Sequence, residues 1–250
     1  MTLRFDFREK SYAIDLDSGV DISVPMGSVR CFYAPEVAYT PYQSGDFIGK
    51  VTEGAPVNFF NVAFNPHGNG THTENMGHIS AAHEGFNDHL RSFHFVSYLV
   101  SCELEKIGAD EVITLESLQR RLPDQLPPAL LIRTLPNRLE KQQTDYSGTN
   151  PPYLSAEAAT WLAAEGVEHL LLDLPSVDRE VDGGKLAAHK AFWGYPATDR
   201  LHCTITELIF VPNEVQDGWY FLNLQTVPFQ LDASPSRPVI FPMHLLAPHQ

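Results

Sequence analysis

The sequence predicts an α/β fold, and three observations support this prediction. The middle third alternates short apolar runs with helix signals, both outer thirds are dominated by strand-forming residues, and no linker divides the 250 residues. Alternating strands and helices are typical of parallel βαβ units, whereas strand-rich segments add further β structure. We therefore expect one α/β domain over residues 1–250.

The middle third supplies the βαβ signals. Thr114 is placed to cap a helix that ends before Pro123, and Ser155 is placed to cap an Ala-rich helix that Gly166 closes. The strands that flank these helices are expected at 95–105, 129–133 and 167–173. This order of strands and helices predicts parallel pairing in the middle of the chain.

Strand-forming residues dominate both ends of the chain. The run at 57–64 is apolar on both of its alternating faces, which is typical of a strand covered on both sides. This run leads directly into the histidine-rich segment, so we expect that segment to begin at a strand end. The other strands are expected at 12–17, 20–24, 31–34, 204–210, 219–229 and 238–242.

Charge and cysteine content restrict the possible partners. The net charge of −14 repels phosphate backbones and anionic membrane surfaces, so we expect neither nucleic acid nor a membrane as partner. Cys31, Cys102 and Cys203 are widely separated, which argues against a disulfide framework and a thiolate zinc site. The chain shows no signal-peptide pattern and no apolar run of membrane-spanning length. We expect a cytoplasmic protein that acts on a small molecule.

Six of the 11 histidines lie between His67 and His94. In an extended segment, residues two apart share a face, so His72 and Glu74 can converge on one ion, and His78 can reach back across a bend. Imidazole and carboxylate donors without a thiolate suit zinc, manganese or iron(II). This segment therefore predicts a divalent metal centre.

A family resemblance becomes specific at this segment. Residues 70–78, GTHTENMGH, resemble the signature H-x-G-T-H-x-D-x-P-x-H of the cyclase-like metal-dependent hydrolases, which include bacterial kynurenine formamidase and isatin hydrolase. Residues 152–162 resemble the family's PYLS helix start, and residues 172–178 resemble its D-x-PSVD segment. The resemblance implies the swivelling β/β/α fold, a single domain with a mixed sheet, a small barrel-like β part and a few helices.

The same resemblance implies roles for individual residues. It makes His72 a metal ligand and Glu74 an acidic ligand that can bridge two ions. His189 and Glu207 are the ligands from the later half, and His78 is the general acid/base. These roles imply a hydrolase in which a metal ion, Zn or Mn, activates water for attack on an amide, formamide or lactam carbonyl. Family members form homodimers or higher homo-oligomers, and the same is expected here.

Three departures from the family pattern predict a divergent member with its own substrate. The family's first His falls on Gly68, so His67 is a metal ligand only if the loop absorbs a shift of one position. The family Asp is Glu74, whose extra methylene moves the carboxylate and can change bridging into single-metal binding. The family Pro is Met76, and the interval between His189 and Glu207 is longer than in the family.

Two other functions remain open. One is a metal-free relative that binds a small ligand without turnover, although the joint presence of His72, His78, His189 and Glu207 argues against it. The other is a cyclase or dehydratase that uses the ion as a Lewis acid on a carbonyl.

Other polar residues are weaker candidates for the site. His202 is an alternative ligand to His189, although a plain strand position explains it more simply. Arg133 either holds an anionic substrate group or forms a structural ion pair. Turn chemistry and helix capping account for Asp173 and Asp178. For His83, His89 and His94 we expect partly exposed positions or positions next to the metal ligands.

Overall fold

The computed structural model describes residues 1–82, 85–197 and 199–247, and seven of the strands in these residues close into a barrel. Four of them, β9, β12, β14 and β15, run parallel, β8 pairs antiparallel with β15 and β17, and β16 closes the ring between β17 and β9. The strand bounds are β8 His72–Glu74, β9 His94–Glu103, β12 Ala129–Leu135, β14 His169–Leu172, β15 Thr204–Glu207, β16 Gly218–Thr226 and β17 Ala233–Pro242. The predicted α/β class with a mixed sheet and a barrel-like β part is confirmed.

The parallel strands β12 and β14 are buried on both faces, as their apolar runs predict. Successive residues of β12 point to opposite sides, so Leu131 packs with Leu99 and Leu222 inside the barrel while Leu130 packs toward the helices. Burial on both faces explains why these strands read as continuous apolar runs rather than as alternating patterns.

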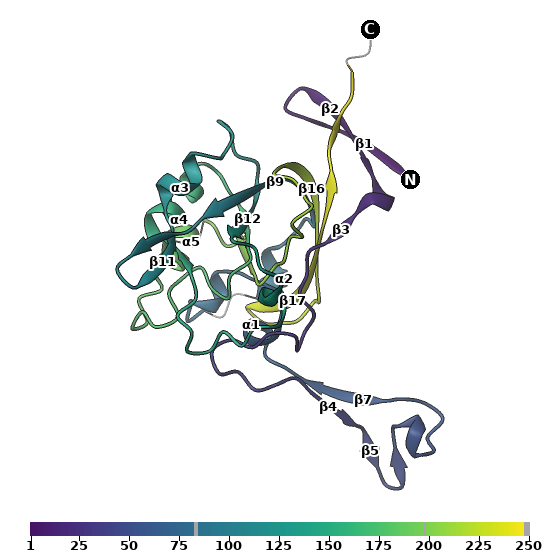
Figure 1. Ribbon diagram of the computed structural model, residues 1–250. Helices are drawn as coiled ribbons and strands as arrows, with labels where there is room; N and C mark the ends of the chain where they lie inside the picture. The colour runs from purple at the N-terminus through teal and green to yellow at the C-terminus, as the bar shows by residue number, and fades with distance from the viewer. Residues whose placement is uncertain (83–84, 198, 248–250) are drawn as a thin grey trace.

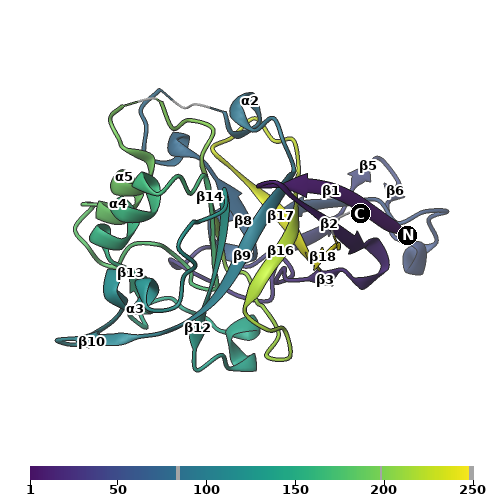
Figure 2. The same ribbon diagram turned by 90° about the horizontal axis from the view of Figure 1, so that it is seen from above.

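Helices α3, α4 and α5 cover one side of the barrel (Figures 1 and 2). The expected caps are confirmed, because Thr114 forms a capping box at α3 and the Ser155 side chain accepts a hydrogen bond from the N–H of Ala158 in α4. Phe192 and Trp193 of α5 are fully buried and belong to the core between helices and sheet. The bounds are α3 Leu115–Gln119, α4 Ala156–Ala164 and α5 Ala187–Trp193.

The run at 57–64 differs from its prediction. Its strand, β7 (Phe60–Ala63), pairs with β4 (Ala38–Pro41), and all four of its residues are exposed. Both strands belong to an arm that projects from the barrel in Figure 1, and within the described residues the side chains of β7 are left uncovered. The arm also contains β5 (Gln43–Ser44), β6 (Phe47–Ile48) and the 3-10 helix η2 (Val51–Glu53).

The N-terminal residues form β1 (Thr2–Phe7) and β2 (Lys10–Asp15), which pair with each other and, through β2, with β18 (His244–Leu245). The predicted strand at 31–34 is a turn, in which Phe32 and Tyr33 have left-handed φ angles of 55° and 56°. Among the described residues, no helix has the length and apolar character needed to cross a membrane. The remaining elements are η1 Leu16–Ser18, β3 Val20–Asp21, α1 Pro66–Asn69, η3 Met76–His78, α2 Phe86–His89, β10 Glu105–Ile107, β11 Asp110–Ile113, η4 Leu139–Gln143 and β13 Tyr153–Leu154.

Candidate metal centre

The centre is built on the pairing of two short barrel strands. His72 and Glu74 lie on β8, and antiparallel pairing with β15 places Glu207 directly opposite His72. Nδ1 of His72 donates a hydrogen bond to the carbonyl oxygen of Gly70 at 3.0 Å, which leaves Nε2 free, 3.3 Å from Oε2 of Glu207. The other oxygen of Glu207 accepts the N–H of Val177 at 2.9 Å. His72, Glu74 and Glu207 are all buried.

His189 reaches the centre from helix α5. The carboxylate of Asp178 accepts the backbone N–H groups of Ala188 and His189, at 2.7 and 3.1 Å, and also accepts Nδ1–H of His189 at 2.7 Å. Nε2 of His189 then faces Oε1 of Glu74 at 3.1 Å. Burial lowers the pKa of His189, but the contacts with Asp178 and Glu74 outweigh this effect and raise the pKa to about 10.

His67 also lies in the centre, so the loop absorbs the shift of one position. It belongs to the short helix α1, whose N-cap Asn65 accepts the N–H of Gly68 at 3.1 Å. Nδ1 of His67 lies 3.0 Å from Oε2 of Glu74. A Cβ atom at Gly68 would lie 2.4 Å from Cβ of Ala34, so this backbone has no room for a histidine at the family's position.

His78 lies at the outer edge of the centre. It ends the 3-10 helix η3, where the side chain of Asn75 accepts the N–H of Gly77 and fixes the bend that the sequence predicts. Nδ1 of His78 lies 3.8 Å from Oε2 of Glu74, and the side chain is 31% exposed. This position gives the ring access to both the centre and the solvent.

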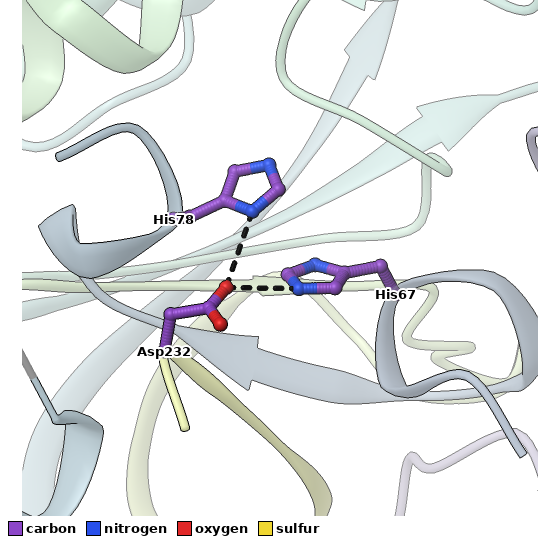
Figure 3. A group of neighbouring side chains, drawn as sticks. All are labelled: His67, His78 and Asp232. Atoms are coloured by element: carbon purple, nitrogen blue, oxygen red, sulfur yellow. Dashed lines mark hydrogen bonds and ion pairs between the residues drawn. The ribbon is translucent and has the colours of Figure 1, made fainter. Parts of the chain in front are cut away.

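Asp232 is a site residue that the sequence did not reveal. Its Oδ2 lies 3.0 Å from Nε2 of His67 and 3.3 Å from Nδ1 of His78 (Figure 3). Pairing of β17 with β8 sets Ala233 opposite Glu74, which carries the preceding Asp232 to the centre. Asp232 is distant in sequence and belongs to no motif, so only the strand pairing identifies it.

Carboxylates and imidazoles shift each other's pKa values in this cluster. Burial lowers the pKa of His67, but its contacts with Asp232 and Glu74 raise it to about 10. Burial raises the pKa of Glu74, and the nearby His78, His189 and His67 together hold it well below its usual range. Hydrogen bonds from His67 and His78 lower the pKa of Asp232. The cluster therefore carries positive imidazoles against negative carboxylates, and a divalent cation can take the place of their protons.

The donor atoms fit a divalent cation. Nε2 of His72 and Oε2 of Glu74 are buried and make no hydrogen bond, and their polar neighbours are the ion-pair contacts with Glu207 and His67. Ligands at about 2.0–2.2 Å from one ion stand about 3.0–3.5 Å apart. The contacts of Glu74 with His67 and His189 and of His72 with Glu207 lie at 3.0–3.3 Å. A shared ion would give both buried atoms a bonding partner.

A cavity of about 380 Å³ opens onto the centre. His67, His78 and His189 line it together with the apolar side chains of Phe32 and Leu186. This volume lies at the lower end of the range of small-molecule sites, about 300–1,000 Å³. A larger cavity of about 450 Å³, near Arg30, contains none of these histidines and has no comparable donor set.

The weaker candidates that lie in the described part of the chain do not join the ligand cluster. His202 lies 3.8 Å from Glu168 and is half exposed. Arg133 is buried and bonded to Ser101, Asp217 and two backbone carbonyls, so it forms the structural ion pair rather than a substrate contact. Nε2 of His94 contacts Asn223 at 2.7 Å, His89 lies in α2, and His83 lies outside the described residues. Asp173 bonds Thr134 and Lys141, whereas Asp178 holds His189 as well as the helix start.

A family model and a curated relative both match most of this chain. A family model described as "Putative cyclase" matches residues 20–179, which include His67 to His78 and Asp178. The kynurenine formamidase of Bordetella petrii is 25% identical over 221 residues, which cover 88% of this chain and 96% of that protein.

Solved structures share the fold at lower sequence identity. A potential metal-dependent hydrolase with cyclase activity superimposes with a TM-score of 0.65 at 18% identity, over 89% of this chain and 96% of that one. Isatin hydrolase A from Labrenzia aggregata superimposes with a TM-score of 0.61 at 12% identity, over 89% and 93%.

Proposed function

The chain belongs to the cyclase family, and we propose that it is a metal-dependent hydrolase that cleaves an amide, formamide or lactam bond of a small molecule. The observation that carries this proposal is the pair of buried atoms without a hydrogen bond, Nε2 of His72 and Oε2 of Glu74, beside a cavity that His67, His189 and Glu207 line. The names of the relatives, kynurenine formamidase and isatin hydrolase, support the bond type.

Five residues would hold the cation: His67, His72, Glu74, His189 and Glu207. When bound, the ion would supply positive charge that polarises a carbonyl and lowers the pKa of a nearby water molecule. Glu74 contacts both His67 and His189, so it would connect the ligand on α1 with the ligand on α5. The Asp178 carboxylate accepts a hydrogen bond from Nδ1 of His189, and the Gly70 carbonyl accepts one from Nδ1 of His72.

His78 is the group in this proposal that moves a proton. Its Nδ1 faces Asp232, and its ring lines the cavity. Nε2 is the nitrogen left to take a proton from the attacking water and to give one to the leaving nitrogen. The buried ligands are less suited to this task, because they cannot readily exchange protons with the solvent.

Metal analysis and a substrate panel test the proposed function. The protein, purified without added ions, is analysed for metal content and assayed on N-formyl arylamines, simple amides and lactams, with and without a chelator. We expect bound metal and a chelator-sensitive hydrolysis. Fewer than about 0.2 ions per chain, unrecovered after addition of zinc or manganese, would instead indicate a metal-free binding protein. Ring closure or water loss without hydrolysis would favour the cyclase or dehydratase alternative.

Zinc or manganese is the proposed ion, because three imidazoles and two carboxylates suit both. The cytoplasm is the proposed compartment, and the free thiols of Cys31, Cys102 and Cys203 support it.

We also propose a homodimer or larger homo-oligomer. The arm supports this proposal, because Tyr39, Phe59 and Val62 are each more than half exposed, and grouped apolar surface is typical of interaction sites. Light scattering coupled to gel filtration tests it, and the mass of a single chain would contradict it.

A further inference from the structure

Asp232 connects two histidines that have different tasks in the proposed function. Both dashed lines in Figure 3 end on the same oxygen, Oδ2, which lies 3.0 Å from Nε2 of His67 and 3.3 Å from Nδ1 of His78. The backbone around Asp232 is fixed on both sides. Its own carbonyl accepts the N–H of Asn75 at 3.1 Å, and the carbonyl of Leu231 accepts the N–H of Phe86 at 2.8 Å.

The chemistry of a carboxylate determines which nitrogen of each ring carries a proton. An ionised carboxylate only accepts hydrogen bonds, so the ring nitrogen that faces it must bear hydrogen. A neutral imidazole with hydrogen on one nitrogen offers a lone pair on the other. In His67 the remaining nitrogen is Nδ1, which lies 3.0 Å from Oε2 of Glu74 and bears hydrogen toward it until a bound ion would take the place of that proton. In His78 the remaining nitrogen is Nε2.

We propose that Asp232 is a positioning residue that fixes the tautomers of both histidines, so that His67 offers Nδ1 to the metal ion and His78 offers Nε2 to the substrate. This inference rests on the proposed function. It gives His67 the arrangement of His189, in which one nitrogen is held by a carboxylate, Asp178, and the other faces Glu74.

The displaced position of His67 explains why such a partner is needed. The side chain extends from a helix of only four residues and is 24% exposed, so the fold restrains it less than the fully buried His72. Its ring lies beside that of His78, with 4.3 Å between the ring centroids. One carboxylate can therefore orient both rings at once.

Zinc affinity is the first test. Zinc binding to the whole protein is measured by competition with a chelating indicator, for the unmodified protein and for Asp232→Asn. Loss of a carboxylate that orients a metal-ligating histidine typically weakens binding about 10- to 100-fold, and this is the expected result. Asp88→Asn, an exposed carboxylate of α2, is the matched control and should leave the affinity unchanged.

The unmodified protein provides the second test, which does not depend on whether a variant folds. Nitrogen-15 NMR of histidine side chains, recorded on the zinc-loaded protein, identifies the protonated nitrogen of each ring. We expect zinc on Nδ1 of His67, hydrogen on its Nε2, and hydrogen on Nδ1 of His78.

Two results would overturn the inference while leaving the proposed function in place. One is zinc affinity in folded Asp232→Asn equal to that of the unmodified protein. The other is zinc on Nε2 of His67, which would place the ion among His67, His78 and Asp232. If the unmodified protein takes up no zinc or manganese, the proposed function fails, and the inference fails with it.

Discussion

Oδ2 of Asp178 lies 2.7 Å from Nδ1 of His189, and the same carboxylate accepts the N–H groups of Ala188 and His189 at the start of α5. One side chain thus begins the helix and also orients the imidazole that the helix carries. The orientation of His189 is therefore coupled to the folding of the segment before α5.

Asp178→Asn should weaken zinc binding about 10- to 100-fold, because the charge that holds Nδ1–H of His189 is lost. Asp182→Asn is the matched control. Asp182 accepts the N–H groups of Gly184 and Leu186 before the same helix and does not contact His189. Competition titration of both variants separates the two effects. Equal weakening would mean that the order of the segment before α5, rather than the Asp178–His189 contact, controls the affinity.

His67→Ala should weaken zinc binding by more than about 100-fold, beyond the loss typical of a residue that only supports a ligand. His202→Ala removes a half-exposed histidine that lies near Glu168, away from the centre, and should bind zinc like the unmodified protein. Metal content after dialysis checks both variants. Unchanged occupancy in His67→Ala would remove His67 from the ligand set.

His78→Ala should lower turnover about 100-fold or more while zinc content stays near that of the unmodified protein, because a general acid/base typically contributes about 10²- to 10⁴-fold. The measurement is kcat on a substrate identified from the panel, together with metal analysis of the same sample. Loss of metal from His78→Ala would make His78 a ligand rather than the proton-transfer residue.

The middle of the fold was predictable because local signals and tertiary structure agree there. The Thr114 and Ser155 caps, the apolar runs of β9, β12 and β14 and their parallel pairing all follow from sequence patterns. The arm was not predictable in the same way. Residues 57–64 have the composition of a covered strand, but burial depends on whether another layer lies above them, which no local pattern encodes.

In the candidate site, too, the residues linked by local spacing were predictable, and a residue brought in by long-range strand pairing was not. His72, Glu74 and His78 are close in sequence, and their spacing alone brings them together on β8 and η3. Asp232 reaches them only because β17 pairs with β8, and that long-range register has no sequence signal. His189 and Glu207 are too far along the chain for spacing to link them with His72. Only the resemblance to the cyclase-like hydrolases suggested them. A family pattern records long-range contacts that spacing cannot show.

Metal binding should depend strongly on pH. The pKa values of His67 and His189 are raised to about 10 in the metal-free protein, so both rings are protonated at neutral pH. A metal ion binds the neutral ring and must displace one proton from each, so raising the pH toward 10 removes the competing protons and strengthens binding. We expect release of about two protons at pH 7.5, measured by calorimetry in buffers of different ionisation enthalpy. Affinity that is independent of pH between 6.5 and 8.5 would contradict this expectation.

Glu74→Asp restores the residue of the family signature, and we expect it to weaken zinc binding at least about tenfold rather than to improve it. The carboxylate of Glu74 contacts Nδ1 of His67 at 3.0 Å and Nε2 of His189 at 3.1 Å. Shortening the side chain by one C–C bond, about 1.5 Å, withdraws it from both rings.

Glu214→Asp, at an exposed position, controls for the substitution itself. Tighter zinc binding by Glu74→Asp would mean that the extra methylene and the displaced histidine are independent changes. The expected loss would mean that they compensate for each other, because a histidine displaced by one position on α1 is reached by a carboxylate that is one methylene longer.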